Sequence, residues 1–271
     1  MLLPPGVDPA VIERLPLAQK LELLALLEEK QRRLGQKAFF HLYPEKPSIW
    51  TGPEVCGGAL SPGRIIHGRD GYRKHLEFFK AGARYRERCA MCANRVGKTF
   101  GMGGYEMSAH LTGLYPDWWE GRRFPGPIRA WAAGKTNETT RDIVQATLLG
   151  EVVSGTRKAL SGTGIIPGDC IDMARITWKM GVADLVDTIR VKHVSGGWSL
   201  LGLKSYQQGR GSFEGTAQHV IWLDEEPDAA VYGECLIRTA TTGGIVMITF
   251  TPLLGLSEVV LQFMPGDQRP D

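Results

Sequence analysis

The pattern of apolar positions divides the chain into an N-terminal helical segment and a longer region in which strands and helices alternate. Leucines recur at three-, four- and seven-residue steps through residues 9–34, with charged side chains between them, which predicts an amphipathic helix. Its apolar side can pack on its own domain or dock on a partner subunit. Prolines and glycines interrupt residues 44–70, which we interpret as a linker or a wrapping arm.

From residue 71 onward the apolar runs change in length and period. Helical periodicity covers three ranges, Tyr72–Ala81, Lys98–Leu111 and Asn137–Leu149. Short apolar runs of strand length cover four more, Tyr85–Ala93, Ile128–Ala133, His219–Leu223 and Ile245–Phe250. Thr136 or Asn137 is expected to cap the third helix. Strands that alternate with helices predict an α/β fold with a mainly parallel central sheet flanked by helices.

One further segment has the pattern of a β-hairpin. Apolar and polar residues alternate from Ile189 to His193, Ser195–Gly197 supplies a turn, and Trp198–Leu203 is a second apolar run. We expect this hairpin to be an insertion in the α/β domain.

Composition sets the size and class of the protein. The chain has 271 residues, of which 43% are hydrophobic and 23% charged, as expected for one globular domain with a small appendage. We place the N-terminal helix and arm at 1–70 and the main domain at 71–271. A net charge of +3 is too balanced to indicate nucleic acid by itself, although a local groove can still be basic. No apolar run is long enough for a membrane span, and the first residues lack the basic start and apolar core of a signal peptide, so we expect an intracellular protein without a membrane partner.

The number and spacing of the cysteines do not predict a disulfide framework. Five are present, and Cys89 and Cys92 form the only CxxC pair. Zinc needs two more ligands, and no second pair follows. A redox pair is an alternative, but small residues buried at the end of a strand explain the pattern better.

A glycine–lysine–threonine sequence follows the first predicted strand and opens a predicted helix. Residues Cys92-Ala93-Asn94-Arg95-Val96-Gly97-Lys98-Thr99 have the register of a phosphate-binding loop, with Cys92 in place of the first glycine. Gly97 lets the backbone approach a phosphate, Lys98 places a cation on it, and the Thr99 hydroxyl can bind Mg²⁺. A surface turn that caps a helix is the alternative. The strand–loop–helix context favours a nucleotide site.

An acidic pair ends the apolar run at Val220–Leu223. A buried strand delivers Asp224 to the sheet edge where α/β proteins bind ligands, so Asp224 is a candidate for holding Mg²⁺. Glu225 is then the candidate base that orients the attacking water, and strand alternation turns Glu226 away. Acids that merely cap a strand are the alternative reading. Together with the loop, however, the pair predicts ATP hydrolysis.

Several stretches together resemble one known family. They are Ala93–Phe100, Gly134–Thr139, Tyr206–Arg210, Trp222–Pro227 and Thr249–Gly255. Their order and spacing, from about residue 20 to the end, resemble the N-terminal ATPase domain of the large terminase subunit of headful-packaging tailed bacteriophages. The resemblance implies a P-loop NTPase fold of the ASCE type, with ATP and Mg²⁺ as cofactors. The family's variant loop often lacks the first glycine, which accommodates Cys92.

The resemblance also implies a function and partners. It implies a motor that uses ATP to translocate double-stranded DNA into a procapsid. It works in the host cytoplasm as a ring, expected to be a pentamer, at the portal protein and together with the small terminase subunit. The family's nuclease domain lies C-terminal to the ATPase, so we expect no nuclease activity from these residues.

Four further roles follow from the resemblance, residue by residue. Arg95 lies near the place of an arginine that acts on the γ-phosphate in cis. Thr249 and Thr251 match the coupling motif, although two threonines are also ordinary strand residues. Arg210 lies in the stretch that holds a trans-acting arginine finger; the nearest position by spacing is Glu214, and Arg210 can instead contact DNA or solvent. His75 stands where relatives have a glutamine that reads adenine.

Two alternatives to a packaging motor remain at this point. Another P-loop nucleic-acid motor, such as a helicase or a recombination ATPase, would share the loop and the acids. An assembly module would bind nucleotide without hydrolysing it and would dock through residues 9–34.

Overall fold

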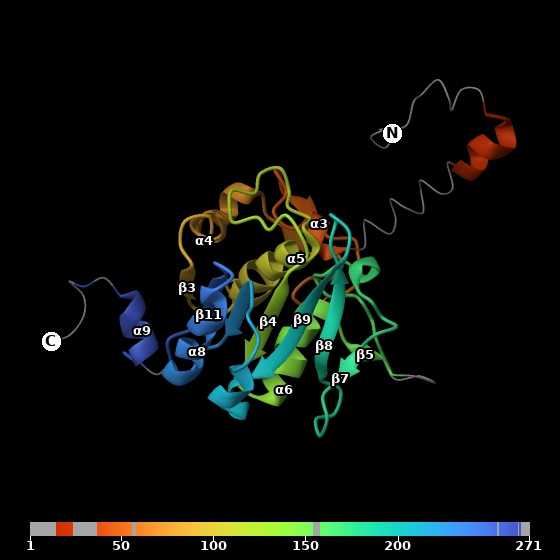
Figure 1. Cartoon of the computed structure of the whole chain (residues 1–271). Coiled ribbons are helices and arrows are strands. Elements are labelled where there is room, and N and C mark those ends of the chain that lie inside the picture. The colour runs from red at the N-terminus through yellow and green to blue at the C-terminus, as the bar shows by residue number, and fades with distance from the viewer. Residues whose placement is uncertain are drawn as a thin grey trace.

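A seven-stranded sheet forms the centre of the computed structural model, which describes residues 15–23, 37–55, 58–153, 158–253, 255–264 and 266 (Figure 1). Its strands, in spatial order, are β3 (Glu87–Met91), β11 (Ile245–Phe250), β10 (Val220–Asp224), β4 (Arg129–Gly134), β9 (Trp198–Ser205), β8 (Val186–Lys192) and β7 (Thr177–Trp178). The first five are parallel to one another, β8 pairs antiparallel with β9, and β7 pairs antiparallel with β8. The predicted α/β class with a mainly parallel sheet is confirmed.

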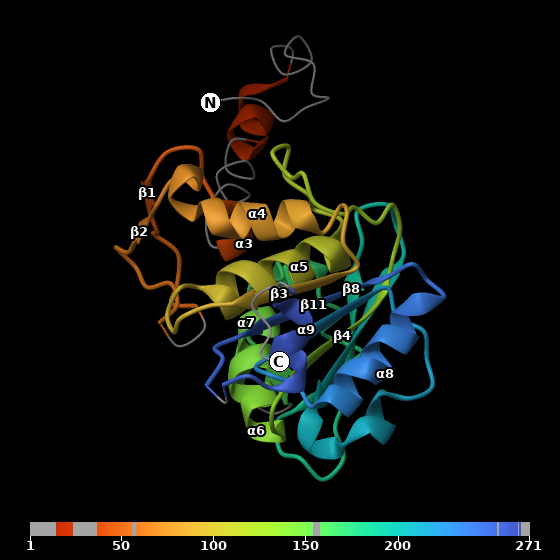
Figure 2. The same ribbon diagram turned by 90° about the vertical axis from the view of Figure 1, so that its left-hand side faces the viewer.

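Helices cover both faces of the sheet (Figure 2). One face carries α4 (Arg73–Ala81), the π-helical turn η2 (Lys98–Gly104), α5 (Tyr105–Thr112) and the helix at 137–149. The other carries α8 (Ala229–Ala240) and α9 (Glu258–Phe263). In β10, Val220 and Trp222 face the first core while Ile221 and Leu223 face the second. The central strands are therefore apolar without alternation, because both of their faces are buried.

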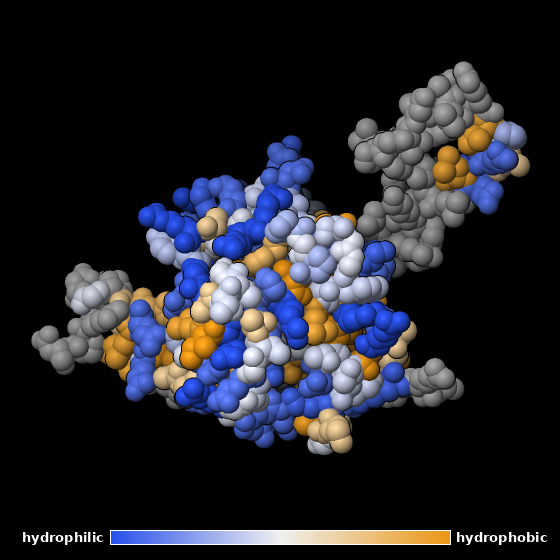
Figure 3. Space-filling model, in the orientation of Figure 1, coloured by the Kyte–Doolittle hydropathy of each residue, from blue (hydrophilic) through white to orange (hydrophobic). Residues whose placement is uncertain are grey.

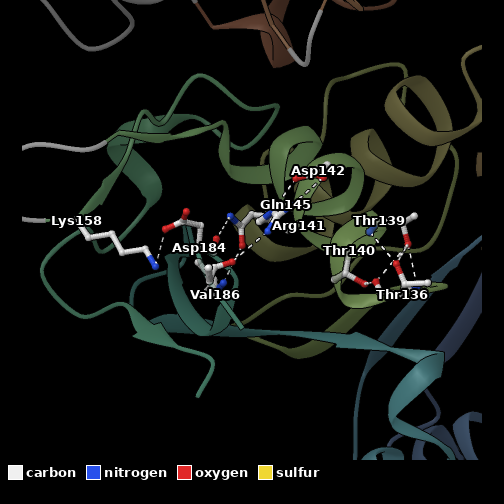
Figure 4. Close-up of polar contacts among 10 residues, drawn as sticks. Thr136, Thr139, Thr140, Arg141, Asp142, Gln145, Lys158, Asp184 and Val186 are labelled. Atoms are coloured by element: carbon white, nitrogen blue, oxygen red, sulfur yellow. Dashed lines mark hydrogen bonds and ion pairs between the residues drawn. The ribbon is translucent and has the colours of Figure 1, made fainter. Parts of the chain in front are cut away.

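The helix at 137–149 is continuous but not uniform. It consists of α6 (Asn137–Thr139), the π-helical segment η3 (Thr140–Gln145) and α7 (Ala146–Leu149). Figure 4 shows its cap, in which the Thr136 hydroxyl accepts a hydrogen bond from the Thr139 N–H. The Gln145 side chain donates to the Asp184 carbonyl at 2.8 Å and accepts from the Val186 N–H at 2.7 Å. The predicted helix is confirmed, with Thr136 as its N-terminal cap. The hydrogen bonds of Gln145 connect this helix to the start of β8.

The predicted hairpin is present, but it is not an insertion. β8 and β9 pair in antiparallel fashion around the turn, and β9 also pairs in parallel with β4 along its length. Leu201, Gly202 and Leu203 are consequently buried. The expectation of an inserted hairpin was wrong because the partner of β9 is β4, a strand far away in the sequence. Two short strands, β5 (Val152–Val153) and β6 (Ala159–Leu160), pair with each other outside the sheet.

The N-terminal part packs against the sheet domain from residue 37 onward. It contains α3 (Ala38–His41), β1 (Ser48–Ile49), β2 (Ile65–Ile66) and the short helix η1 (Arg69–Tyr72). Trp50, Leu60 and Ile66 form a small apolar cluster of their own, whereas Phe39 and Tyr43 belong to the main core. The interpretation of residues 44–70 as a linker or a wrapping arm stays a prediction. A domain boundary at residue 70 stays a prediction.

Only part of the predicted 9–34 helix falls within the described residues. Residues 17–23 are helical, and the rest of that prediction lies outside the described residues. Leu17 and Leu21 are 73% and 58% exposed, and apolar residues are visible on this helix in Figure 3. In the described part of the chain, no helix is both long and apolar enough to cross a membrane.

Three single turns complete the fold. They are η4 (Gly168–Cys170), η5 (Tyr206–Gln208) and η6 (Arg210–Phe213). The last two lie between β9 and β10 and carry the Tyr206–Arg210 stretch to the edge where β10 ends.

Candidate active site

The candidate residues gather where three neighbouring parallel strands end. The loop at 92–97 follows β3, Asp224 is the last residue of β10, and Thr249 and Thr251 lie at the end of β11. β11 lies between the other two strands, so its threonines can reach both the loop and the acids. Parallel strands present their carboxyl ends on one edge, which is where α/β proteins bind ligands.

At two positions the backbone of the phosphate loop has a conformation that glycine adopts more readily than other residues do. Arg95 and Gly97 both have left-handed conformations, with φ of 63° and 83°. Such a conformation is uncommon for a residue with a side chain and concentrates at functional sites. The Cys92 N–H donates to the Phe250 carbonyl at 3.1 Å, which ties the loop's start to β11. The Arg95 side chain is exposed, as are Asn94 and Val96.

Lys98 is a buried cation that is held by neutral oxygens. Its Nζ donates to the Thr251 hydroxyl at 2.8 Å and lies 3.4 Å from the Asn94 amide oxygen, while Thr251 donates to that same oxygen at 2.9 Å. Lys98 is only 8% exposed, and no carboxylate of the described residues forms an ion pair with it. Asp224 is the nearby opposite charge, but it forms no direct ion pair with Lys98, and a buried cation without such a pair is costly, so the site favours an incoming anion.

Asp224 is a buried carboxylate surrounded by hydroxyls. It accepts hydrogen bonds from Thr249 at 2.7 Å and from Thr99 at 3.0 Å, and the Trp222 indole N–H in turn donates to the Thr249 hydroxyl at 2.8 Å. Burial raises the pKa of Asp224 to about 7, although these hydrogen bonds oppose the rise. The ionised form is therefore not fully compensated by its surroundings. A carboxylate beside the Thr99 hydroxyl is an oxygen set that Mg²⁺ accepts when phosphates complete its shell.

Glu225 lies in a fixed turn directly after the strand. Its φ is 69°, its N–H donates to the Thr249 carbonyl at 2.9 Å, and the Tyr206 hydroxyl donates to the carbonyls of Asp224 and Glu225 at 2.8 and 3.1 Å. The Glu225 carboxylate is close enough to oppose ionisation of Asp224. By contrast, Glu226 contributes to the raised pKa of Cys89, on the α8 side of the sheet.

Arg210 lies apart from these residues. Its guanidinium bonds the buried Glu234 carboxylate of α8 at 3.1 Å and lies 3.7 Å from Glu214. Within the described residues, Arg210 makes no hydrogen bond or ion pair to the loop or to the acidic pair. Arg238 holds the other oxygen of Glu234 at 2.9 Å.

His75 lies against the outer side of the loop. Its Nε2 is 3.0 Å from the Val96 carbonyl and its Nδ1 is 2.8 Å from the Tyr43 hydroxyl. Burial lowers the pKa of His75, against an opposing contribution from the Val96 carbonyl, so the ring is neutral near pH 7. A cavity between the loop and the N-terminal segment is lined by His75, Tyr72, Gly97, Phe100, Leu60 and Ile65.

Sequence reasoning missed three residues that support this site. Tyr206 fixes the acidic turn, Trp222 orients Thr249, and Tyr43 contacts the loop through His75. Tyr206 lies in a stretch that the family resemblance had marked, but nothing local in the sequence distinguishes Trp222 or Tyr43. Cys89 and Cys92 are free thiols with a raised pKa, which burial causes in both, as a structural role requires.

Fold and site together define a class of protein. A glycine–lysine–threonine loop follows β3, the edge strand of the sheet, and opens a helix. Asp224 ends β10, which lies two places from β3 in the parallel part of the sheet. These features define a P-loop NTPase fold. The chain belongs to the family described as terminase large subunit, T4likevirus-type, N-terminal, whose model matches residues 89–270.

Individual relatives agree with that assignment. The chain is 34% identical, over an alignment of 279 residues, to the large terminase subunit of Salmonella phage P22, covering 96% of this chain and 49% of the relative. The chain thus spans about half the length of that curated relative.

Among solved structures, the large terminase of a thermophilic bacteriophage matches with a TM-score of 0.45 and 13% identity, over 66% of this chain and 38% of that one. A mutant of the large terminase ATPase domain of Thermus phage P74-26 matches with a TM-score of 0.43 and 13% identity, over 68% and 69%.

Proposed function

We propose that this chain binds ATP with Mg²⁺ and hydrolyses it as the motor domain of a DNA-packaging terminase. The observation that carries the proposal is the presence at one sheet edge of a buried cation, Lys98, and a buried carboxylate, Asp224, which stabilise each other too weakly to offset the burial of the carboxylate. Both charges would be neutralised at once by a phosphate chain and its metal ion. Membership of the terminase family supports the coupling of this chemistry to translocation of double-stranded DNA.

Each loop and strand residue then has a role. The backbone of residues 92–99 cradles the phosphates and Lys98 contacts the terminal ones. Thr99 and Asp224 hold Mg²⁺, which when bound neutralises developing phosphate charge. Glu225 orients and activates the attacking water. The cavity that His75 and Tyr72 line is where we place the adenine base.

The coupling role of the two threonines follows from their present partners. Lys98 must exchange the Thr251 hydroxyl for phosphate oxygen when nucleotide enters, which frees Thr251. Thr249 shares Asp224 with Thr99, so a metal ion at Asp224 changes the hydrogen bonds of Thr249. Both changes act on β11, the strand that leads into these threonines. We infer that phosphate occupancy is passed to the rest of the domain through this strand.

Lys98→Ala tests nucleotide binding directly. Removal of a charge-assisted contact to phosphate costs about 1.5–3 kcal/mol, so the affinity for ADP should fall roughly 10- to 150-fold. Titration calorimetry with Mg²⁺ and ADP measures this. Lys192→Ala is the matched control and should bind normally, because this exposed lysine ends β8 opposite the first residue of β9, on the other edge of the sheet.

A second assay tests the task of hydrolysis. A packaging-competent protein that carries these residues should fail to fill procapsids with DNA when Lys98 is alanine. Normal packaging by that variant would exclude the proposed mechanism. Nucleotide binding without any hydrolysis, even in the assembled motor, would instead favour the assembly-module alternative.

The two candidate arginines make different predictions. Arg95 is already in the loop and can act in cis, whereas Arg210 must leave Glu234 to act on a neighbour's nucleotide. If Arg210 acts in trans, mixing Arg210→Ala subunits with Glu225→Gln subunits should restore part of the ATPase activity of the assembled motor. No recovery at any mixing ratio would favour Arg95 alone.

The partners of the whole machine are also proposals. We propose that the motor assembles as a ring, a pentamer, on the portal protein of the procapsid, with the small terminase subunit, in the host cytoplasm. Its membership of the terminase family supports this setting.

A further inference from the structure

A fully buried tyrosine of the N-terminal segment reaches the outer side of the phosphate loop. The Tyr43 hydroxyl donates a hydrogen bond to the Gly101 carbonyl at 2.6 Å and lies 2.8 Å from His75 Nδ1. His75 Nε2 lies 3.0 Å from the Val96 carbonyl. Two side chains from outside the loop therefore hold two backbone carbonyls, one on each side of Lys98.

The backbone conformation of Tyr43 and the contacts of its ring both fix the position of this side chain. Its backbone is left-handed, with φ of 60°, although it is not glycine. Its ring makes edge contacts with five others, Tyr72, His75, Phe79, Tyr105 and Trp118. A strained backbone persists only when its surroundings fix it, and such residues concentrate at functional sites.

The loop is also shaped to receive these two side chains. A Cβ atom at Gly97 would lie 3.2 Å from His75 Cε1, and one at Gly101 would lie 3.0 Å from the Tyr43 hydroxyl oxygen. Glycine at both positions allows this close approach. The sequence-level reason for Gly97 was the phosphate, and the structure adds a second reason on the opposite side.

The proton count assigns the direction of each hydrogen bond. The Val96 carbonyl can only accept, so His75 Nε2 carries the proton of the neutral ring. Nδ1 is then an acceptor, so Nδ1 and the Gly101 carbonyl share the single proton of the Tyr43 hydroxyl as their donor. Loss of the Tyr43 hydroxyl would leave both acceptors without this donor in a buried place.

We propose that Tyr43 and His75 are positioning residues that hold the phosphate loop in its anion-binding form. In a planar trans peptide the C=O and the following N–H point in opposite directions. When His75 holds the Val96 carbonyl outward, the Gly97 N–H points inward, toward the phosphate site. This inference rests on the proposed nucleotide site and assigns His75 a contact with the loop in addition to any contact with the base.

Four variants distinguish this positioning role from a general contribution to the stability of the fold. Tyr43→Phe removes the shared donor. His75→Gln keeps an amide N–H near the place of Nε2, whereas His75→Asn keeps one only near Nδ1. Tyr115→Phe is the matched control, because its hydroxyl makes the same kind of contact, 2.9 Å from His110 Nδ1, away from the loop.

The expected result is a pattern across two measurements. Tyr43→Phe and His75→Asn should weaken ADP binding about tenfold, or about 1.4 kcal/mol. His75→Gln should weaken it less than His75→Asn, and Tyr115→Phe should stay near wild type. Without nucleotide, hydrogen exchange of the amides at 96–102 should become faster in the first two variants only. In Tyr43→Phe the ratio of ADP to GDP affinity should not change.

Other outcomes give distinct answers. Unchanged loop exchange in Tyr43→Phe, or equal acceleration in Tyr115→Phe, would overturn the inference. A changed ADP-to-GDP ratio with normal loop exchange in the His75 variants would also overturn it and assign His75 to the base alone. Absence of ADP binding by the wild type would count against the proposed function, while the exchange measurement would still decide the positioning role.

Discussion

Glu225→Gln should bind Mg²⁺ and ADP normally but should hydrolyse ATP roughly 10²–10⁴-fold more slowly, the range lost with a general base. The variant keeps the size of the side chain and the turn, because the turn is fixed by backbone bonds to Thr249 and Tyr206. Only the proton acceptor is removed. Single-turnover measurement of phosphate release by the assembled motor separates this step from binding.

The neighbouring glutamate, Glu226, supplies the control for the effect of Glu225→Gln. Glu226→Gln changes the neighbouring carboxylate, which lies on the Cys89 side of the sheet, and should leave the rate of hydrolysis within a few-fold of wild type. A reversed pattern, with Glu226→Gln slow and Glu225→Gln normal, would move the base to Glu226.

Gly103→Ala is expected to have the largest effect on stability. A Cβ atom there would lie 2.2 Å from Cε2 and Nε1 of Trp222, a fully buried ring whose indole N–H is bonded to Thr249. Overpacking of this kind costs about 1–3 kcal/mol or more. A loss of about 3 kcal/mol lowers the Tm by roughly 6–12 °C in a domain of this size.

A glycine-to-alanine substitution at a position with free space around it tests whether the close contact with Trp222 causes the loss of stability. Gly233 lies inside α8 with no atom of the described residues within 4 Å of an added Cβ, so Gly233→Ala should be neutral or should stabilise by about 0.5–1 kcal/mol. Thermal unfolding of the two variants in parallel decides the matter. If Gly103→Ala melted with the wild type, the close packing of η2 on Trp222 could not be correct.

The parts of the site that the sequence predicted are those that are local in the chain. Strand, loop and helix follow one another around Lys98, and a buried strand ends at Asp224, so short motifs were enough to predict that these residues lie at the carboxyl ends of their strands. The strands of the parallel sheet were likewise visible as apolar runs, because each central strand is buried on both faces.

The parts that were missed depend on contacts between distant segments. No local pattern reveals that Tyr43 would reach Gly101, that Arg210 would pair with Glu234, or that β9 would join β4. The π-helical form of η2 is similarly a tertiary result, since the loop, Trp222 and Tyr43 all constrain it. Periodicity alone predicted an ordinary helix there.

If Arg95 and Glu225 have the proposed roles, their left-handed backbones set the stability of the fold against activity at the same two positions. At both positions a glycine codon would relieve conformational strain and favour the folded state, yet it would delete the guanidinium or the carboxylate. A glycine substitution that stabilises the fold would then be removed by selection for activity at these two codons. In an alignment of descendants, retention of charge at these positions would record the activity of the motor rather than the demands of its fold.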